Sequence, residues 1–118
     1  MLDTAKALNE FYSSFGIPAY KNDNVPDDVT YPYLTYSLSF PEWDEPVTHF
    51  CTVYMRTESI QPLLAKADQI RRAIGTGRSI PCSDGCLYLY YDHADPVTTP
   101  VDGVKGIYIE LELNVLHS

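Results

Sequence analysis

Two cysteines, Cys82 and Cys86, are the side chains of this sequence that come nearest to a metal-binding motif. They enclose a Ser-Asp-Gly segment, and His49 and His93 offer the nearest imidazoles. A structural zinc ion takes four ligands, usually from two close pairs. Here one pair has an unusual spacing, a second pair is missing, and Gly85 favours a turn that leads into a strand. We therefore expect a turn with two small apolar thiols, and no metal.

A second segment, Gly-Thr-Gly-Arg at residues 75–78, has the composition of a phosphate-binding loop. Such loops precede a helix, because the helix N-terminus presents free N–H groups and the positive end of the dipole. These glycines instead follow a helical pattern. They predict the C-terminus of a helix.

Catalysis by a nucleophile would need a Cys–His or Ser–His pair oriented by an acid. Gly-x-Ser-x-Gly does not occur, and the three histidines stand in separate contexts, with His117 next to the last residue. Paired acids occur at Asp27 and Asp28, at Asp44 and Glu45, and at Glu110 and Glu112. Acids in turns and on solvated strand faces are common, so we expect no enzyme, no catalytic residue and no cofactor.

The composition describes a folded, acidic chain of 118 residues, which is the length of one domain. Eight Lys and Arg against sixteen Asp and Glu give a net charge of -8. This balance argues against specific nucleic-acid binding and against an anionic membrane, since both need clustered cations. No apolar run approaches the ~20 residues of a membrane span, and no basic-then-apolar leader is present. Three cysteines favour a reducing cytosol.

Apolar periodicity predicts the elements that hold these residues. Spacing of i, i+3, i+4 and i+7 predicts a helix over about residues 4–15, capped by Asp3 or Thr4 and stopped at Gly16. Residues 17–29 read as a loop, with a short strand possible at 17–20. A second helix starts after Ser59, has Pro62 in its first turn, and ends at Gly75.

Alternation of apolar and polar residues predicts the strands. Residues 34–40 and 48–56 form an antiparallel hairpin, joined by an acidic connection that carries Trp43. Residues 87–91 and 107–115 form two further strands, separated by a long break at 92–105. The fold class is α+β, in the order α-β-β-α-β-β. We expect a mostly antiparallel sheet of four or five strands, with both helices packed on one face.

The ten tyrosines exceed the needs of one small core. Tyr54, Tyr88, Tyr90 and Tyr108 lie opposite the residues assigned to the core. Tyrosine combines a large contact area with a polar end, which suits interfaces. We expect these four residues in an interface between subunits; the alternative is a sheet covered on both faces within one chain. Trp43 either contacts a partner or neighbouring subunit, or packs back onto the sheet.

The sequence also resembles a viral family along nearly its whole length. The matching stretches are A-L-N-E-F-Y-S-S-F-G-I-P-A-Y, N-V-P-D-D-V-T-Y-P-Y-L-T-Y, Y-M-R-T-E-S, K-A-D-Q-I-R-R-A-I-G-T-G and G-I-Y-I-E-L-E-L-N-V-L. They resemble the small tail, tail-completion or minor capsid proteins of siphophages that infect Gram-positive bacteria. These proteins are similar to the tail-terminator group, which includes the lambda-type terminator. Residues 92–100 depart from this pattern, because they are acidic and proline-rich where relatives carry a basic loop.

The resemblance implies one tail-terminator-like domain over residues 1–118. It also implies a hexameric ring of this chain, in the virion tail or in the host cytoplasm during assembly. The ring would cap the tail tube and join it to the head, so its partners would be the tail tube protein and head-completion or connector proteins. A non-viral α+β ligand-binding or regulatory module is the first alternative. A small hydrolase that uses the dispersed acids is the second.

Within such a ring, Glu110 and Glu112 need access to water. They share one side of the last strand, and burying two carboxylates together without cations would cost several kcal/mol. Water is available in the lumen or on the outer wall. We expect a lumen-facing position, because carboxylates do not retain passing DNA phosphates; an ordinary solvated outer face is the alternative.

Overall fold

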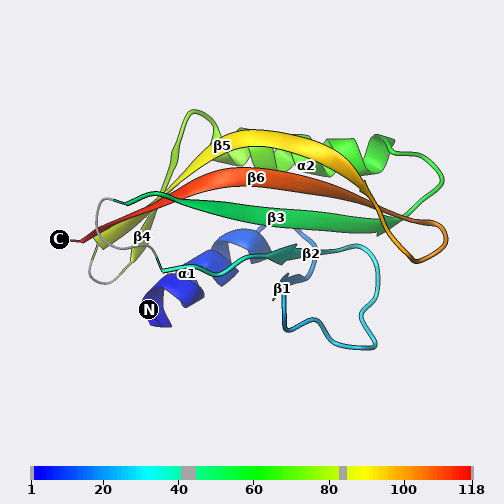
Figure 1. Cartoon of the computed structure of the whole chain (residues 1–118), viewed down its shortest axis with the longest axis horizontal. Helices are drawn as coiled ribbons and strands as arrows, with labels where there is room; N and C mark the ends of the chain where they lie inside the picture. Colours follow the sequence, from blue (N-terminus) through cyan, green and yellow to red (C-terminus); the bar gives the residue numbers. More distant parts are fainter. Residues whose placement is uncertain (1, 41–44, 83–84, 118) are drawn as a thin grey trace.

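The computed structural model of the chain describes residues 2–40, 45–82 and 85–117. In this part of the chain, two helices pack against a single mixed sheet of six strands, which makes the fold α+β (Figure 1). The elements in chain order are α1 (Leu2–Ser13), β1 (Ala19–Lys21), β2 (Tyr33–Tyr36), β3 (Val47–Arg56), α2 (Gln61–Ile74), β4 (Arg78–Cys82), β5 (Gly85–Thr98) and β6 (Val104–His117).

The strands follow the spatial order β1-β2-β3-β6-β5-β4. Strands β1 and β2 are parallel, and every other neighbouring pair is antiparallel. The expectation of four or five strands was therefore wrong, because two short edge strands extend the sheet. Strand β4 contains Pro81, which weakens a strand pattern in the sequence. Proline is tolerated there because only one side of an edge strand forms ladder hydrogen bonds.

Strand β5 passes through the segment predicted as a long break. It stays paired with β6 as far as Thr98, and its register shifts between Tyr91 and His93. This β-bulge makes Asp92 an extra residue, so that both Tyr91 and Ala94 pack against the core. The odd-numbered residues face the core before the bulge, and the even-numbered ones after it. The alternation of apolar and polar residues in the sequence is therefore interrupted at the bulge, although the strand continues through it.

Other boundaries differ by a few residues. Helix α1 begins at Leu2, so Asp3 and Thr4 lie inside the helix and do not precede it. Strand β2 ends at Tyr36, earlier than predicted, and the Phe40 side chain is exposed. The C-terminus of α2 agrees with the prediction, since Gly75 has a positive φ of 59° and donates its N–H to the Arg71 carbonyl.

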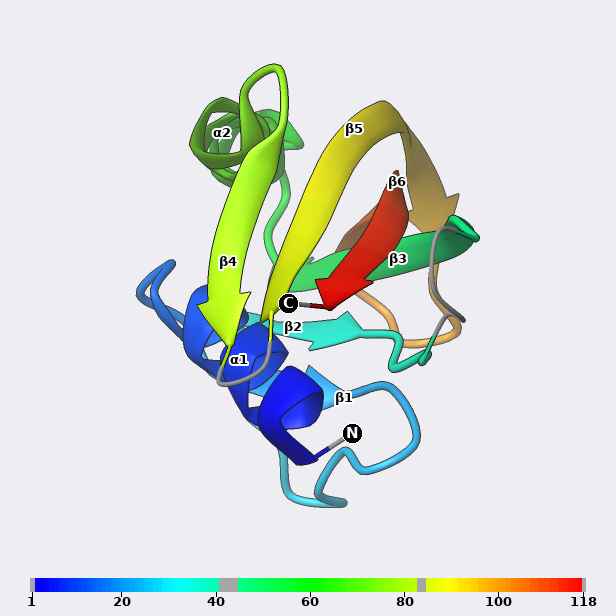
Figure 2. The same cartoon turned by 90° about the vertical axis from the view of Figure 1, so that its left-hand side faces the viewer.

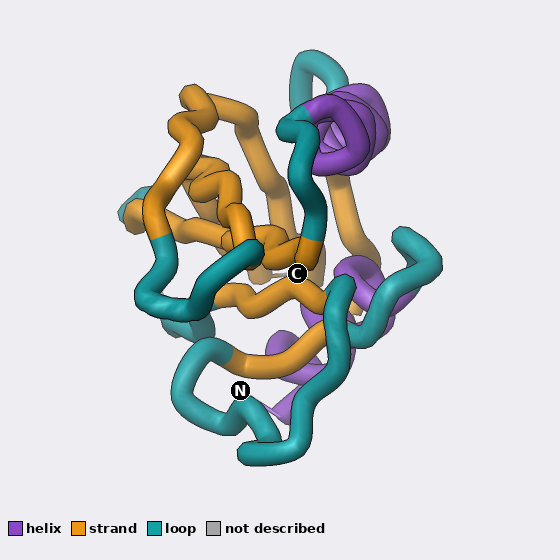
Figure 3. The backbone as a smooth tube through the Cα atoms, turned by 90° about the vertical axis from the view of Figure 1, so that its right-hand side faces the viewer, coloured by secondary structure: helices purple, strands orange, loops and turns teal. Residues whose placement is uncertain are grey.

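Both helices cover the same face of the sheet (Figures 2 and 3), as predicted. Their buried side chains join one cluster with alternate residues of the strands. Strand β6 contributes the unbroken apolar face that alternation predicted. The residues of this core include Leu8, Tyr12, Leu63, Ile70, Val53, Leu89, Ile107, Ile109, Leu111, Leu113 and Val115. The opposite face of the sheet, which we call the open face, has no helix over it in the described part of the chain.

Candidate interaction surface on the open face of the sheet

The structure brings the four predicted interface tyrosines to the open face. Tyr54 of β3 pairs with Gly106 of β6, and Tyr108 follows two residues later on β6. Tyr88 and Tyr90 of β5 pair with Asn114 and Glu112 of β6, farther along the same face. The Tyr90 side chain is 40% exposed, and the other three are half-buried. In the isolated chain, part of the apolar surface of these four rings is therefore still accessible to solvent.

A group of aromatic rings that the sequence did not predict surrounds Tyr54. The ring of Tyr33 stacks on Tyr54 at 5.1 Å between centroids, and Tyr31 and Tyr20 lie 5.5 and 6.1 Å from Tyr33. The guanidinium of Arg56 lies 5.1 Å from the centre of the Tyr31 ring, which is cation–π distance. We call Tyr20, Tyr31, Tyr33 and Tyr54 the aromatic cluster. These rings come together because β2 lies beside β3.

Burial inside this cluster changes the acidity of one member. Burial raises the pKa of Tyr33, and the neighbouring Tyr31 and Tyr54 add to the shift. Tyr33 is therefore uncharged at neutral pH. The cluster presents flat rings with hydroxyl groups, a composition that suits a protein–protein contact.

Gly106 leaves space for two side chains above β6. A Cβ atom at this position would lie 2.8 Å from Cγ2 of Val97 and 3.3 Å from Cδ1 of Tyr54. Val97 comes from β5 and Tyr54 from β3, so both reach toward the central strand from opposite sides. A larger residue at position 106 would displace one or both of these side chains.

The Tyr90 ring packs against its own chain next to β4, whereas the sequence predicts it in an interface between subunits. A Cβ atom at Gly77 would lie 2.9 Å from Cε1 of Tyr90, so the ring covers the backbone just before β4. Tyr88 and Tyr90 stand at one end of the open face, and the aromatic cluster stands at the other. The candidate surface is thus divided and not one continuous tyrosine patch.

Acidic side chains occupy the area between these two ends. Glu112 is exposed, and Glu110 is half-buried and accepts a 2.9 Å hydrogen bond at Oε1 from the Tyr108 hydroxyl. Burial raises the pKa of Tyr108, and the bond to Glu110 and the charges of Glu110, Asp92 and Asp95 raise it further. The structure places both predicted glutamates on the open face, but it gives Glu110 partners that the sequence did not indicate.

The β-bulge supplies an imidazole to these acids. Nδ1 of His93 lies 3.5 Å from Oδ2 of Asp92 and 3.7 Å from Oε2 of Glu110. Nε2 of the same ring lies 3.3 Å from Oδ2 of Asp95. We call Asp92, His93, Asp95 and Glu110 the acid–imidazole cluster. One ligand atom from each of Asp92, His93 and Glu110 fits within a 4.8 Å separation, so these three could hold a metal ion.

Other predicted residues lie elsewhere. Trp43 and its neighbour Asp44 fall outside the described residues. Cys82 is the last residue of β4, and Cys86 lies in β5, where it pairs with Pro81. The turn predicted between the two cysteines involves residues 83–84, which lie outside the described part of the chain. His49 is fully buried in the core, so its side chain is not part of any surface site.

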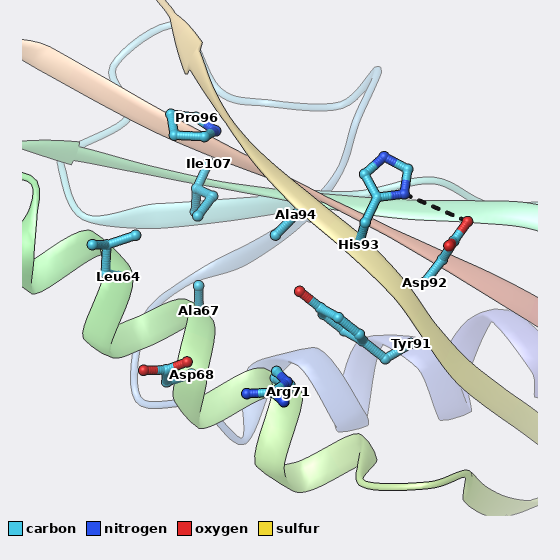
Figure 4. A pocket seen from close by; sticks show the side chains of 10 residues that line it. All are labelled: Leu64, Ala67, Asp68, Arg71, Tyr91, Asp92, His93, Ala94, Pro96 and Ile107. Carbon is cyan, nitrogen blue, oxygen red and sulfur yellow. Dashed lines mark ion pairs between the residues drawn. The ribbon is translucent and has the colours of Figure 1, made fainter.

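A groove runs between α2 and β5, on the side of the sheet that carries the helices (Figure 4). Its volume is about 580 Å³, and Leu64, Ala67, Tyr91 and Ile107 are among the residues that line it. Strand β4 pairs only with residues 85–89, so the next part of β5 forms a strand edge beside this groove. The bulge, two aspartates and Pro96 protect this edge from pairing with another strand.

No helix in the described residues is both long and apolar enough to cross a membrane. No protein-family model matches the sequence, and no curated protein matches it. Among solved structures, the chain is similar to a chain of the "Virion of native gene transfer agent (GTA) particle". The TM-score is 0.67 at 15% identity, over 97% of this chain and 92% of the other. The similarity shows that the two chains share a fold.

Proposed function

We propose that this chain is a structural protein of a phage-like particle and that it acts by assembling with copies of itself. One observation carries the proposal: a partly exposed aromatic surface on the helix-free face of a sheet, in a fold shared with a virion chain over nearly its full length. A face that presents stacked tyrosines is suited to a protein contact, because buried aromatic anchors dominate interface energetics.

The finer proposal is a tail-terminator role. A ring of identical subunits uses a heterologous contact, in which one patch of each copy meets a different patch of the next and the rotation closes. We assign the aromatic cluster with Tyr108 to one patch of this contact, and Tyr88 and Tyr90 at the other end of the open face to the second patch. The two faces of the ring would then meet the tail tube and the head-completion proteins. We expect six subunits from the resemblance of the sequence to tail terminators.

Glu110 and Glu112 lie between the two groups of tyrosines, and we call them the acidic band. We assign a separate role to this band. Glu112 is exposed, and no Lys or Arg of the described residues forms an ion pair with it or with Glu110. We assign this band to the lumen, where fixed negative charge would repel DNA phosphates. The chain would be a passive channel wall and not an enzyme.

Light scattering at high protein concentration tests the assembly. We expect an oligomer whose mass is a multiple of the chain mass, and a stable monomer would contradict the ring and favour a ligand-binding or regulatory module. Tyr90→Glu and Tyr54→Glu should reduce the oligomer more than the melting temperature. Leu64→Glu is the matched control for Tyr90→Glu, because Leu64 is 42% exposed, close to the 40% of Tyr90, but lies on α2, on the other side of the sheet. An unchanged oligomer with a collapsed melting temperature would assign the tyrosine to the core.

Gene order tests the finer role. Genes for a tail tube, a tape measure and a portal beside this one would support a tail terminator. Addition of purified tail tube protein should then give a complex that contains one ring per tube end, visible by electron microscopy. Rings that never associate with tube ends would contradict the terminator role while leaving the structural role intact.

A further inference from the structure

We propose that Asp92, His93 and Glu110 bind a divalent transition-metal ion, with Zn²⁺ as the best match, at the β-bulge of β5, where the open face meets the sheet edge beside the groove. The motif spacing of the sequence predicted no metal site, and its only candidate pair was Cys82 and Cys86. The new site is formed by one imidazole and two carboxylates from two neighbouring strands, and it goes beyond the proposed assembly role.

The β-bulge creates this arrangement. In a regular strand, successive side chains point to opposite faces, so Asp92 and His93 could not both face Glu110. At the bulge, two residues of β5 oppose one residue of β6, and His93 becomes the partner of Glu110 in the register. Figure 4 shows Asp92 and His93 side by side on β5, with the ion-pair contact between them.

The distances fit a shared ion. Zinc lies about 2.0–2.2 Å from imidazole nitrogen and carboxylate oxygen, so two ligands at a tetrahedral angle are roughly 3.3–3.5 Å apart. Nδ1 of His93 lies 3.5 Å from Oδ2 of Asp92 and 3.7 Å from Oε2 of Glu110. Side-chain shifts of a few tenths of an ångström would complete the coordination. Water would fill the remaining position, because the site is open to solvent.

Two further side chains orient the ligands. Nε2 of His93 faces Oδ2 of Asp95 at 3.3 Å, so with an ion on Nδ1 the ring proton on Nε2 would point at this carboxylate. The Tyr108 hydroxyl donates to Oε1 of Glu110 at 2.9 Å, which leaves Oε2 available for the ion. Ligands in metal sites commonly have such partners, which hold the ring and the carboxylate in place. This support distinguishes the site from a simple group of surface acids.

Charge and ligand type select the ion. Three carboxylates surround one imidazole, and no Lys or Arg of the described chain forms an ion pair with them. A divalent cation would relieve their mutual repulsion. Mg²⁺ and Ca²⁺ prefer all-oxygen sites, whereas an imidazole nitrogen with carboxylates suits Zn²⁺.

Isothermal titration calorimetry of the full chain with Zn²⁺ tests the site. The titration uses a Cys82→Ser, Cys86→Ser background, because thiols would bind Zn²⁺ independently. We expect one Zn²⁺ per chain, and binding weaker by roughly tenfold or more in His93→Ala and in Glu110→Gln. Tyr108→Phe should weaken binding less, because it removes only an orienting group. Asp102→Asn is the matched control, since it removes an exposed acid at the other end of the β5–β6 hairpin and should leave the affinity unchanged.

Two results would overturn the proposal. One is the absence of saturable Zn²⁺ binding in the background protein, and the other is equal affinity in His93→Ala, with melting curves showing that every variant is folded. Excess Mg²⁺ should not displace the Zn²⁺, and displacement would also count against a nitrogen ligand. Binding is measured per chain on the isolated protein, so failure of the ring model and failure of the metal site are distinguishable.

Discussion

The hydroxyl of Tyr12 lies 2.7 Å from Nε2 of His49, in the core between α1 and β3, and both side chains are fully buried. On the other side of the ring, Oγ of Ser37 lies 3.0 Å from Nδ1 and accepts the N–H of Phe50. The Ser37 hydroxyl can then donate to Nδ1, and the Nε2 proton is directed at Tyr12. This network accommodates a neutral imidazole with one donor and one acceptor nitrogen. Burial accordingly lowers the pKa of His49 to about 4.

The first prediction is a loss of stability in acid that depends on His49. An unfolded histidine has a pKa of about 6.5, so below that pH the unfolded chain binds a proton that the folded chain excludes until about pH 4. The free energy of unfolding should fall across this window by about 3 kcal/mol from His49 alone. Urea denaturation at pH 7, 5.5 and 4.5 measures the fall.

His49→Gln should flatten this pH dependence, whatever its effect at pH 7. An unchanged slope in His49→Gln would show that His49 is not the source of the acid sensitivity.

The second prediction concerns the hydroxyl of Tyr12. Tyr12→Phe keeps the ring that stacks on Tyr36 at 5.0 Å but leaves the buried Nε2 of His49 without its hydrogen-bond partner. An unsatisfied buried polar atom costs about 1–3 kcal/mol, so the melting temperature should fall. Tyr90→Phe, which loses a hydroxyl from an exposed ring, should change stability by no more than about 0.5 kcal/mol. Equal effects of the two changes would contradict the network.

The third prediction tests the contact above Gly106. Gly106→Ala should cost about 1–3 kcal/mol, because the new methyl group would overlap Val97 and crowd Tyr54. In the double variant, Val97→Ala should restore most of the free energy of unfolding that Gly106→Ala removes. Val97→Ala alone should not raise the free energy of unfolding. Denaturation of both single variants and the double variant gives the coupling energy. Additive losses would show that the two positions do not meet.

The fourth prediction concerns charge on the open face. Glu110→Lys with Glu112→Lys should leave the ring intact but reduce DNA passage, because lysines in a lumen would bind phosphates. Salt should relieve the block by screening this attraction. The yield of DNA-filled particles measures passage, and light scattering measures the ring.

Glu112→Lys alone is the cleaner variant, because Glu110 also accepts a bond from Tyr108 and faces His93. Asp68→Lys makes the same charge change on α2, on the side of the sheet that carries the helices, and should leave the yield normal. A normal yield from the double lysine variant would exclude the lumen assignment.

Local patterns in the sequence were sufficient to predict the elements that repeat regularly. The alternation from Ile107 to Val115 predicted both faces of β6, and helical spacing with Gly75 predicted α2 and its end. The same alternation predicted that Tyr54, Tyr88, Tyr90 and Tyr108 share the face opposite the core. Side-chain direction repeats every two residues in a strand and every 3.6 in a helix, so neighbouring residues are enough to determine it.

Only the tertiary structure decided which of these faces carry a site. The bulge at Asp92 breaks the alternation, and pairing with β6 keeps β5 in the sheet through that break. His93 meets Glu110, and Tyr33 meets Tyr54, across neighbouring strands whose register no local pattern determines. The order of strands and their register depend on how the whole core packs, because a one-residue shift would turn each side chain to the other face. No local pattern contains that information.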